Sequence, residues 1–342
     1  MPTLNQLGRI MARTSAVALS SLLLSGASMA SAKVSYVSNP KTLDFMGEMQ
    51  EKHNFTKAEL KTWFSSANKQ QSILDAIARP AEKTKTWGEY RKIFLTDRRV
   101  NRGVEFWKNN RATLERAERT FGVPAEMIVA IIGVETRYGR ITGSYRVIDA
   151  LSTLAFDYPK RSPFFTKELR EFLLLTREQK MNPLVLRGSY AGAMGYGQFM
   201  PSSFRNYAVD FDDDGITDIW QNPVDAIGSV ANYFKRHGWQ KGEMVTSLAT
   251  AGTDHKKEIL NDSLKPLHTL GSLNQKGFLP ANTETQTQDS PANIMRLKGD
   301  EGVEYWVGYK NFYVITRYNH SRLYAMAVYQ LSKAIKKAVE AS

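Results

Sequence analysis

The sequence predicts a mainly α-helical, α+β fold in which helical segments surround a small β-rich part. Apolar residues recur at helical spacing through much of residues 33–239 and again near the C-terminus, and short apolar runs gather between residues 294 and 316. With 342 residues, 42% of them hydrophobic, the chain is long enough for two or three domains. We therefore expect a helical domain (33–122), a core domain with the candidate site (123–239), a small β-rich domain (240–316) and a C-terminal helix packed on the helical parts (317–342).

The first 32 residues have the pattern of a secretion signal. Arg9 and Arg13 precede an apolar run at 16–24, and the Ala-Ser-Ala sequence at 30–32 has the form of a signal-peptidase site. The run is too short to cross a bilayer as a helix. We interpret residues 1–32 as a cleaved signal peptide and expect the mature chain outside the cytoplasm.

The chain contains no cysteine, which excludes disulfides, thiol nucleophiles and thiolate metal sites. We also expect no lipid anchor, because lipid attachment after a signal peptide requires a cysteine at the cleavage point. The full chain has a formal charge of +12, and removal of the two signal arginines leaves +10. This charge favours an anionic partner such as the cell wall. Nucleic acid is disfavoured, because Lys and Arg are scattered and no nucleic-acid-binding module is recognisable.

Residues 33–122 contain several helix signals. The Thr-Lys-Ala-Glu sequence at 56–59 is a capping box that begins a helix, and a short helix is expected at 72–78. A longer helix is predicted at 99–120, with Gly122 as its C-cap. The aromatic and basic residues at 87–92 either bind a sugar or serve packing alone.

A carboxylic acid is predicted on the apolar face of the next helix. Pro124 suits the first helical turn, and one face of the helix then presents Ile128, Ile131, Ile132 and Glu135. Burial disfavours the charged form of a carboxyl group, so Glu135 is expected to hold its proton tightly and to serve as a general acid. The alternative is a glutamate at the end of a core helix that forms a salt bridge with a nearby arginine.

Helices are predicted at 148–156 and 166–178, before a glycine-rich loop. Four glycines lie between residues 188 and 197, which indicates turns with positive φ or close backbone approach. The loop lacks the Gly-Lys-Ser/Thr ending of a phosphate-binding loop, so a nucleotide site is disfavoured. Its composition suits the floor of a polysaccharide groove, and a tight structural loop explains it equally well.

Residues 210–221 match most of an EF-hand calcium loop. The acidic positions 1, 3, 5 and 9 are Asp210, Asp212, Asp214 and Asp218. Position 6 is Gly215, and position 7 is Ile216, which would supply a backbone carbonyl. Position 12 is Gln221 instead of glutamate. Asp225 either closes the site, in competition with Asp218, or interacts only with a helix dipole. Because five carboxylates within nine residues repel one another, we predict bound calcium.

Residues 240–292 are polar and weakly periodic. Beyond them, short strands are predicted at 294–297, 303–307 and 312–316. Residues 319–321 then cap a final helix at 323–339.

Four motifs together resemble the membrane-bound lytic murein transglycosylase B family. They are IGVETRYG at 132–139, GSYAGAMGYGQFMP at 188–201, DAIGSVANYF at 225–234 and YNHS at 318–321. The resemblance covers about residues 87–238 and 293–331 and is weak elsewhere. The missing anchor cysteine indicates a soluble, periplasmic member.

The resemblance implies a lysozyme-like core and cleavage of the MurNAc–GlcNAc β-1,4 bond of peptidoglycan, with 1,6-anhydromuramoyl products. It implies that Glu135 is the single acid/base, because this family lacks the second carboxylate of most glycosidases. The implied substrate-binding residues are Ser189, Gln198, Tyr233, Tyr318, Asn319, Tyr324, Tyr90, Lys160 and Arg161. The implied calcium ligands are Asp210, Asp212, Asp214, Asp225 and the carbonyl of Ile216. No organic cofactor is expected, and a monomer is expected.

Two other functions fit the same motifs. A muramidase on the same fold would hydrolyse the same bond with water. A non-catalytic, calcium-dependent peptidoglycan-binding protein would keep the aromatic groove without needing a buried acid. The missing second carboxylate favours the transglycosylase.

Overall fold

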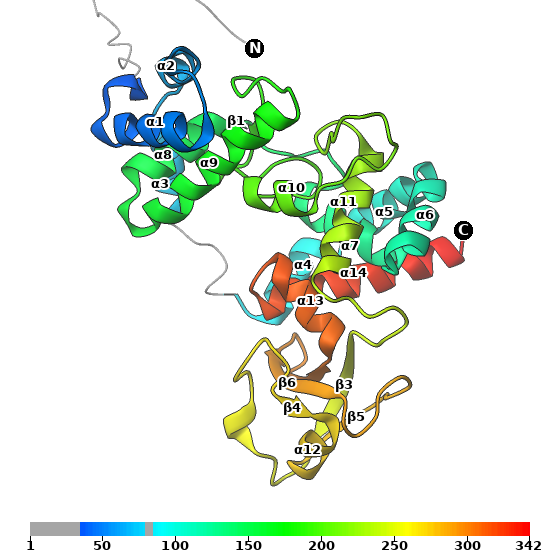
Figure 1. Cartoon of the computed structure of the whole chain (residues 1–342). Coiled ribbons are helices and arrows are strands. Elements are labelled where there is room, and N and C mark those ends of the chain that lie inside the picture. The colour runs from blue at the N-terminus through cyan, green and yellow to red at the C-terminus, as the bar shows by residue number, and fades with distance from the viewer. Residues whose placement is uncertain (1–34, 79–84) are drawn as a thin grey trace, which may run out of the picture. The chain divides into compact units, whose positions relative to one another are not determined.

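Helix α7 (Ala125–Thr136) lies within the main helical core because it is apolar on nearly every side. Its residues from Ala125 to Gly133, apart from Glu126, are all buried. A helix that is hydrophobic all round is stable only when its neighbours cover it. That cover is provided by α5 (Asp97–Asn109), α6 (Arg111–Phe121), α11 (Pro223–Arg236) and α14 (Arg322–Glu340) (Figure 1).

The structure, a computed structural model, describes residues 35–78 and 85–342. The predicted signal peptide lies outside these residues. The other helices are α1 (Pro40–His53), α2 (Lys57–Ser66), α3 (Gln71–Ile77), α4 (Trp87–Phe94), α8 (Val147–Asp157), α9 (Ser162–Glu178), α10 (Pro201–Tyr207), α12 (Leu270–Gln275) and α13 (Lys310–Tyr318), with 3-10 turns at Tyr36–Ser38, Pro159–Arg161 and Lys257–Ile259. Throughout the described ranges, each helix is too short or too polar to span a bilayer.

A second hydrophobic core joins α1–α3 to α8 and α9. Phe45, Phe64 and Phe156 meet edge to face there, with ring centroids 5.9, 6.1 and 6.2 Å apart. The residues predicted as one helical domain therefore contribute to two cores, α1–α3 to this one and α4–α6 to the core around α7. The described residues belong to one compact unit, and the domain boundaries drawn from the sequence remain a prediction.

Two predicted helix ends are confirmed, and one predicted helix is wrong. The capping box of Thr56 and Glu59 is present, and Gly122 ends α6 with φ +72°. The single helix predicted at 99–120 is wrong, because the chain breaks at Asn110 into α5 and α6. Asn110 has non-helical backbone angles, and its side-chain Nδ2 donates to the carbonyl of Phe106 at 2.8 Å.

A five-stranded antiparallel sheet forms the β-rich part, in the order β4-β6-β7-β3-β5 (Figure 1). Its strands are β3 (Thr246–Ala251), β4 (His268–Thr269), β5 (Phe278–Pro280), β6 (Pro291–Lys298) and β7 (Val303–Gly308), while β1 (Tyr145–Arg146) and β2 (Arg187–Gly188) pair separately. β6 and β7 confirm two predicted strands. β3, β4, β5 and α12 lie in the stretch that showed only weak periodicity.

The strand predicted at 312–316 is wrong, because these residues belong to α13. Their β-branched and aromatic composition favours a strand, but tertiary context overrides such preferences. Phe312 and Ile315 are buried in the core around α7. The side chain of Asn311 holds the start of α13, because it accepts from the Gln240 N–H and donates to the Gln240 carbonyl, both at 2.8 Å.

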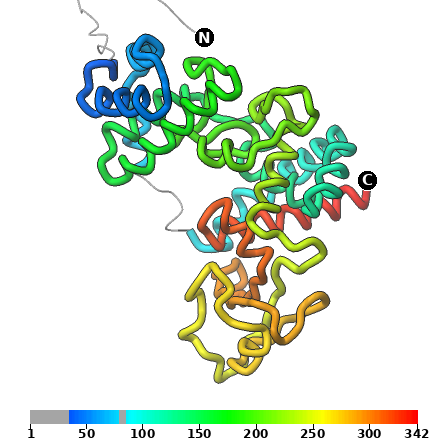
Figure 2. The backbone as a smooth tube through the Cα atoms, viewed as in Figure 1, coloured from blue at the N-terminus to red at the C-terminus, as the bar shows by residue number. Residues whose placement is uncertain are grey.

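The C-terminal helix packs against helices from the first third of the chain. α14, drawn in red, packs on α4 and α5, drawn in cyan (Figure 2). Residues from both halves of the sequence therefore surround the end of α7.

Candidate active site

Glu135 lies half-buried in the last turn of α7, where the backbone reverses sharply. Arg137 and Tyr138 donate their backbone N–H groups to the carbonyls of Gly133 and Ile132, both at 3.2 Å. Arg137 and Tyr138 have φ of +52° and +63°. Positive φ costs a non-glycine residue roughly 1–3 kcal/mol and persists only where surrounding contacts over-determine it. The contacts around this helix end therefore hold it tightly.

Arg99 and Tyr138 are two of the residues that hold the helix end. Arg99 is buried and donates from Nη1 to the Gly133 carbonyl at 2.8 Å, while Tyr138 Oη donates to the Arg99 carbonyl at 2.8 Å. Burial raises the pKa of Tyr138 well above its ordinary range, so the phenol remains a donor. Sequence patterns did not single out either residue, because the partner of a buried arginine leaves no local signal.

Thr136 links α7 to the glycine-rich loop. Its Oγ1 lies 2.9 Å from the Tyr196 carbonyl oxygen and accepts the Gly139 N–H at 3.0 Å. Gly139 has φ +80°, and a Cβ there would lie 2.2 Å from the Tyr196 ring. Glycine is therefore required at 139, both for its backbone angle and for the space that Tyr196 occupies.

Tyr324, from α14, contacts Glu135 directly. The Tyr324 side chain is 3% exposed, and its Oη donates to Glu135 Oε1 at 2.5 Å. Burial, and then the charge of Glu135, raise the pKa of Tyr324 and of its neighbour Tyr318 well above the ordinary range. Tyr324 therefore stays protonated and orients the carboxyl group.

The glycine-rich loop packs beside this pair through Tyr318. Tyr318 Oη donates to the Gly197 carbonyl at 2.7 Å. A Cβ added at Gly197 would lie only 2.8 Å from Tyr318 Oη. Gln198 donates from Nε2 to the carbonyls of Thr142 and Gly195 at 3.1 and 3.0 Å. Ser189 Oγ accepts the Ala193 N–H at 3.1 Å. Contacts inside the protein thus support the interpretation of a tight structural loop.

Two further tyrosines predicted to bind substrate lie in the same region. The Tyr233 ring is 4.7 Å from that of Tyr318, and its Oη donates to the Arg317 carbonyl at 2.6 Å. Tyr90, on α4, is 3% exposed, and its phenol lies close enough to Tyr324 to raise that residue's pKa. Asn319, at the end of α13, is half-buried.

Lys160 and Arg161 lie elsewhere, on the exposed 3-10 turn between α8 and α9. The Arg161 guanidinium lies over the Phe164 ring, 4.4 Å from its centroid. This turn belongs with the second core and not with the end of α7, and the substrate role of both residues remains a prediction.

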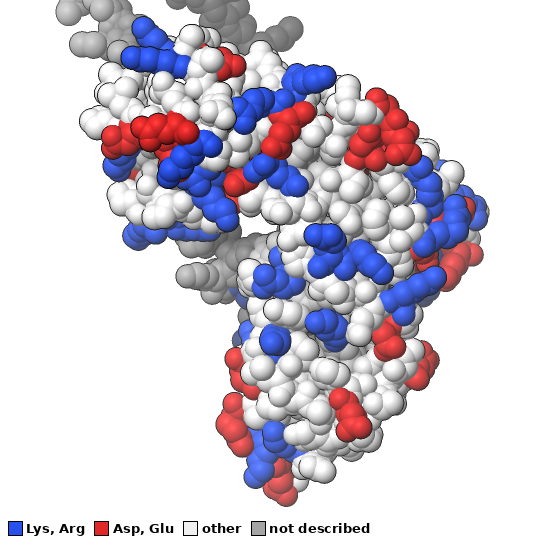
Figure 3. Space-filling view, viewed as in Figure 1, with Lys and Arg blue, Asp and Glu red and all other residues white. Residues whose placement is uncertain are grey.

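The predicted calcium loop joins α10 to α11. Ligand oxygens of Asp210, Asp212 and Asp214 lie within 4.8 Å of one another, and acidic side chains gather over this loop (Figure 3). In the described ranges, no Lys or Arg forms an ion pair with these three. A cluster of uncompensated carboxylate oxygens suits a hard cation such as calcium.

Asp225 ties the two ends of this loop together. It is fully buried, and its Oδ1 and Oδ2 accept the N–H groups of Phe211 and Asp218, both at 2.7 Å. Burial raises the pKa of Asp225, and these hydrogen bonds oppose the shift. Each carboxylate oxygen keeps a further lone pair, so Asp225 remains a predicted ligand, as does the carbonyl of Ile216.

The chain is similar to known proteins over most of its length. The family model described as a transglycosylase SLT domain matches residues 38–333. Membrane-bound lytic murein transglycosylase B of Escherichia coli (strain K12) is 44% identical over 312 residues, which are 89% of this chain and 84% of that protein.

Solved structures are similar over nearly the same range. The catenated lytic transglycosylase SltB1 of Pseudomonas aeruginosa has a TM-score of 0.86 and 55% identity, covering 89% of this chain and 99% of that one. Escherichia coli lytic transglycosylase Slt35 in complex with calcium has a TM-score of 0.80 and 44% identity, covering 88% and 94%. The predicted α+β fold with a lysozyme-like core is confirmed, and the chain belongs to the lytic murein transglycosylase family.

Proposed function

We propose that this chain is a lytic transglycosylase that cleaves the MurNAc–GlcNAc β-1,4 bond of peptidoglycan with Glu135 as its single acid/base. The placement of Glu135 is the main support. Its carboxyl group is half-buried at a strained helix end, and the buried phenol of Tyr324 fixes its orientation at 2.5 Å. A partly desolvated, oriented carboxyl group is suited to proton transfer.

In the first step, the Glu135 carboxylic acid donates its proton to the glycosidic oxygen. The bond between C1 of MurNAc and this oxygen then breaks, and the GlcNAc side leaves as an alcohol. Positive charge develops at C1, where the N-acetyl group of the substrate stabilises it. Glu135 is now a carboxylate, and the Tyr324 hydrogen bond stabilises that charge.

In the second step, the Glu135 carboxylate takes the proton of the C6 hydroxyl on the same MurNAc. O6 then bonds to C1 and forms a 1,6-anhydro ring. The acid is regenerated and no water is consumed. One carboxyl group therefore acts first as acid and then as base.

The surroundings of Glu135 support the use of one carboxylate. Glycosidases with two carboxylates place them about 5–10 Å apart across the bond. The four motifs that resemble the family contain one glutamate, Glu135, and their one other acid is Asp225, which belongs to the predicted calcium loop. A hydrolytic muramidase would need a second group to activate water.

The mass of the released muropeptides tests the reaction type. We expect residues 33–342 to release products that are lighter by one water than their reducing-end counterparts. Products with ordinary reducing MurNAc ends would assign hydrolysis instead. Retained binding with no products would assign a non-catalytic wall-binding protein.

The predicted groove residues supply complementary groups for a glycan. Both amide hydrogens of Gln198 are used inside the protein, which leaves Oε1 to accept from an acetamide N–H or a sugar hydroxyl. Ser189 accepts one hydrogen bond and still has its hydroxyl hydrogen to donate. Tyr90, Tyr233, Tyr318 and Tyr324 would form the floor of the groove beside Glu135. The amide of Asn319 would bind a sugar hydroxyl, and Lys160 and Arg161 would contact more distant parts of the strand.

We also propose a structural calcium ion in the α10–α11 loop, held by Asp210, Asp212 and Asp214. At free calcium about 100 times Kd, bound metal raises the free energy of unfolding by about 2.7 kcal/mol. Calcium is therefore expected to raise the Tm of the wild type but not that of Asp210→Ala/Asp214→Ala. Asp213→Asn, which alters a neighbouring acid outside the cluster, is expected to keep the response. A calcium response that survives the double substitution would remove the metal from this loop.

The net charge and the N-terminal pattern support a periplasmic enzyme whose partner is the glycan strand of peptidoglycan. A monomer remains a prediction. Fractionation is expected to find the mature chain, starting near Lys33, free of the membrane pellet.

A further inference from the structure

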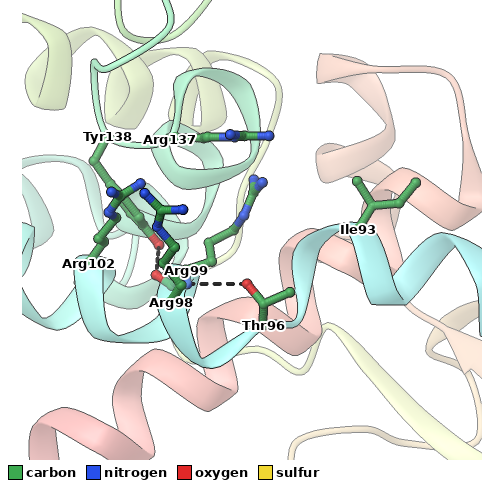
Figure 4. Close-up of a pocket in the computed structure, with 7 residues that line it drawn as sticks. All are labelled: Ile93, Thr96, Arg98, Arg99, Arg102, Arg137 and Tyr138. Carbon is green, nitrogen blue, oxygen red and sulfur yellow. Dashed lines mark hydrogen bonds between the residues drawn. The ribbon is translucent and has the colours of Figure 1, made fainter. Parts of the chain in front are cut away.

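A basic pocket of about 190 Å³ opens beside the end of α7. It is lined by Ile93, Thr96, Arg98, Arg99, Arg102, Arg137 and Tyr138 (Figure 4). The arginines of α5 extend towards the reversal that carries Arg137 and Tyr138 (Figure 4). The pocket therefore shares its wall with the helix end that holds Glu135.

The positive charge of the pocket is not neutralised. None of the four arginines forms an ion pair with an acid in the described part of the chain. The pKa of Arg102 is lowered, first by desolvation and then by the charges of Arg140, Arg98 and Arg137. The exposed carboxylate of Glu105 raises this pKa, but by less than the other effects lower it. Of the four, only Arg99 has a clear structural task, at the Gly133 carbonyl. Arg98, Arg102 and Arg137 keep their guanidinium groups available.

The size of the pocket limits what it can hold. Pockets for whole small-molecule ligands have about 300–1,000 Å³, so this pocket suits one anionic group and not a disaccharide or a nucleotide. Planar guanidinium groups recognise carboxylates in a bidentate manner. Aromatic contacts connect the pocket to Glu135. The Arg99 guanidinium lies over the Phe94 ring, 5.0 Å from its centroid, and the Phe94 ring is 5.2 Å from that of Tyr90. Tyr90 in turn lies beside Tyr324, which donates to Glu135, so a strand bound at Glu135 brings the groups attached to its MurNAc close to this pocket.

We propose that this pocket binds a carboxylate of the peptide stem carried by the glycan strand next to the cleaved bond. The inference rests on the proposed cleavage at Glu135 and adds a determinant of substrate choice. Arg98 and Arg102 would contact the carboxylate, while Arg99 holds the pocket wall.

The variant Arg98→Gln/Arg102→Gln tests this assignment. Its KM on peptide-bearing strands is expected to rise about ten-fold with kcat nearly unchanged, because a charge-assisted contact to the bound substrate is lost. On strands stripped of peptides by an amidase, wild type and variant are expected to behave alike. Arg111→Gln/Arg119→Gln removes the same charge from α6, outside the pocket, and is expected to match wild type on both substrates. An equal KM increase on peptide-free strands, or no increase at all, would overturn the proposal.

Titration of the free stem peptide separates this proposal from the cleavage chemistry. The peptide is expected to bind wild-type residues 33–342 and the α6 control, but at least about ten-fold more weakly to Arg98→Gln/Arg102→Gln. This readout holds even if no cleavage is found. Binding of inorganic phosphate in place of the peptide would assign the pocket to phosphate groups and refute the peptide subsite.

Discussion

Replacing Glu135 with glutamine is expected to lower cleavage of peptidoglycan by about 10² to 10⁴-fold. Glutamine keeps the size of the side chain and still accepts the Tyr324 hydrogen bond, but it can neither donate nor take up the proton. Because one group serves both steps, the upper end of this range is expected. Release of soluble muropeptides measures the loss, and the thermal unfolding curve and sedimentation with insoluble peptidoglycan are expected to stay near wild type.

Glu126→Gln is the matched control for this substitution. Glu126 lies on the same helix, in its first turn, and is paired with Lys336 at 3.2 Å. This variant is expected to retain cleavage, with at most about 1 kcal/mol of lost stability. If Glu135→Gln cleaved as fast as wild type, a different acid would be responsible.

Replacing Asp225 with alanine is expected to lower the free energy of unfolding by about 2–4 kcal/mol. The buried Asp225 carboxylate accepts the backbone N–H groups of Phe211 and Asp218, and alanine leaves both without their acceptor. The substitution also removes the buried negative charge of Asp225, which is unfavourable in itself, but this gain offsets only part of the lost free energy of unfolding. Chemical denaturation in EDTA measures the effect without any contribution from calcium.

Asp218→Ala provides the comparison. Its Oδ1 also accepts two N–H groups, from Trp220 and Gln221, but it is half-buried and water can replace it. We expect roughly half the loss seen for Asp225→Ala. If Asp225→Ala lowered the free energy of unfolding in calcium but not in EDTA, Asp225 would act on stability only through the metal.

Much of the local structure around the site was predictable from short patterns. The apolar spacing at 128–135 placed Glu135 on a helix, and Gly122 and the Thr56 capping box marked helix ends that the structure confirms. The spacing of Asp210, Asp212 and Asp214 likewise indicated a cluster that the structure brings within 4.8 Å. These signals are local, because they depend on which face of one helix is buried or on one turn of backbone.

Other features depended on contacts that no local pattern records. Composition favoured a strand at 312–316, but burial of Phe312 and Ile315 against the helical core makes this segment a helix. β4 and β5 have only two and three residues, too few to show a periodicity of their own. β3 is found through its pairing with β7, β4 through β6, and β5 through β3.

By itself, the sequence determined the helical character of the chain, the position of Glu135 on α7, the acidic loop and the motifs of the family. Only the tertiary structure decided how Glu135 is held. Its partner Tyr324 lies 189 residues away, and the Arg99 side chain reaches the end of α7 from α5. The physical reason is that helical periodicity reports burial of one face, whereas the identity of the group that covers it depends on how distant helices pack.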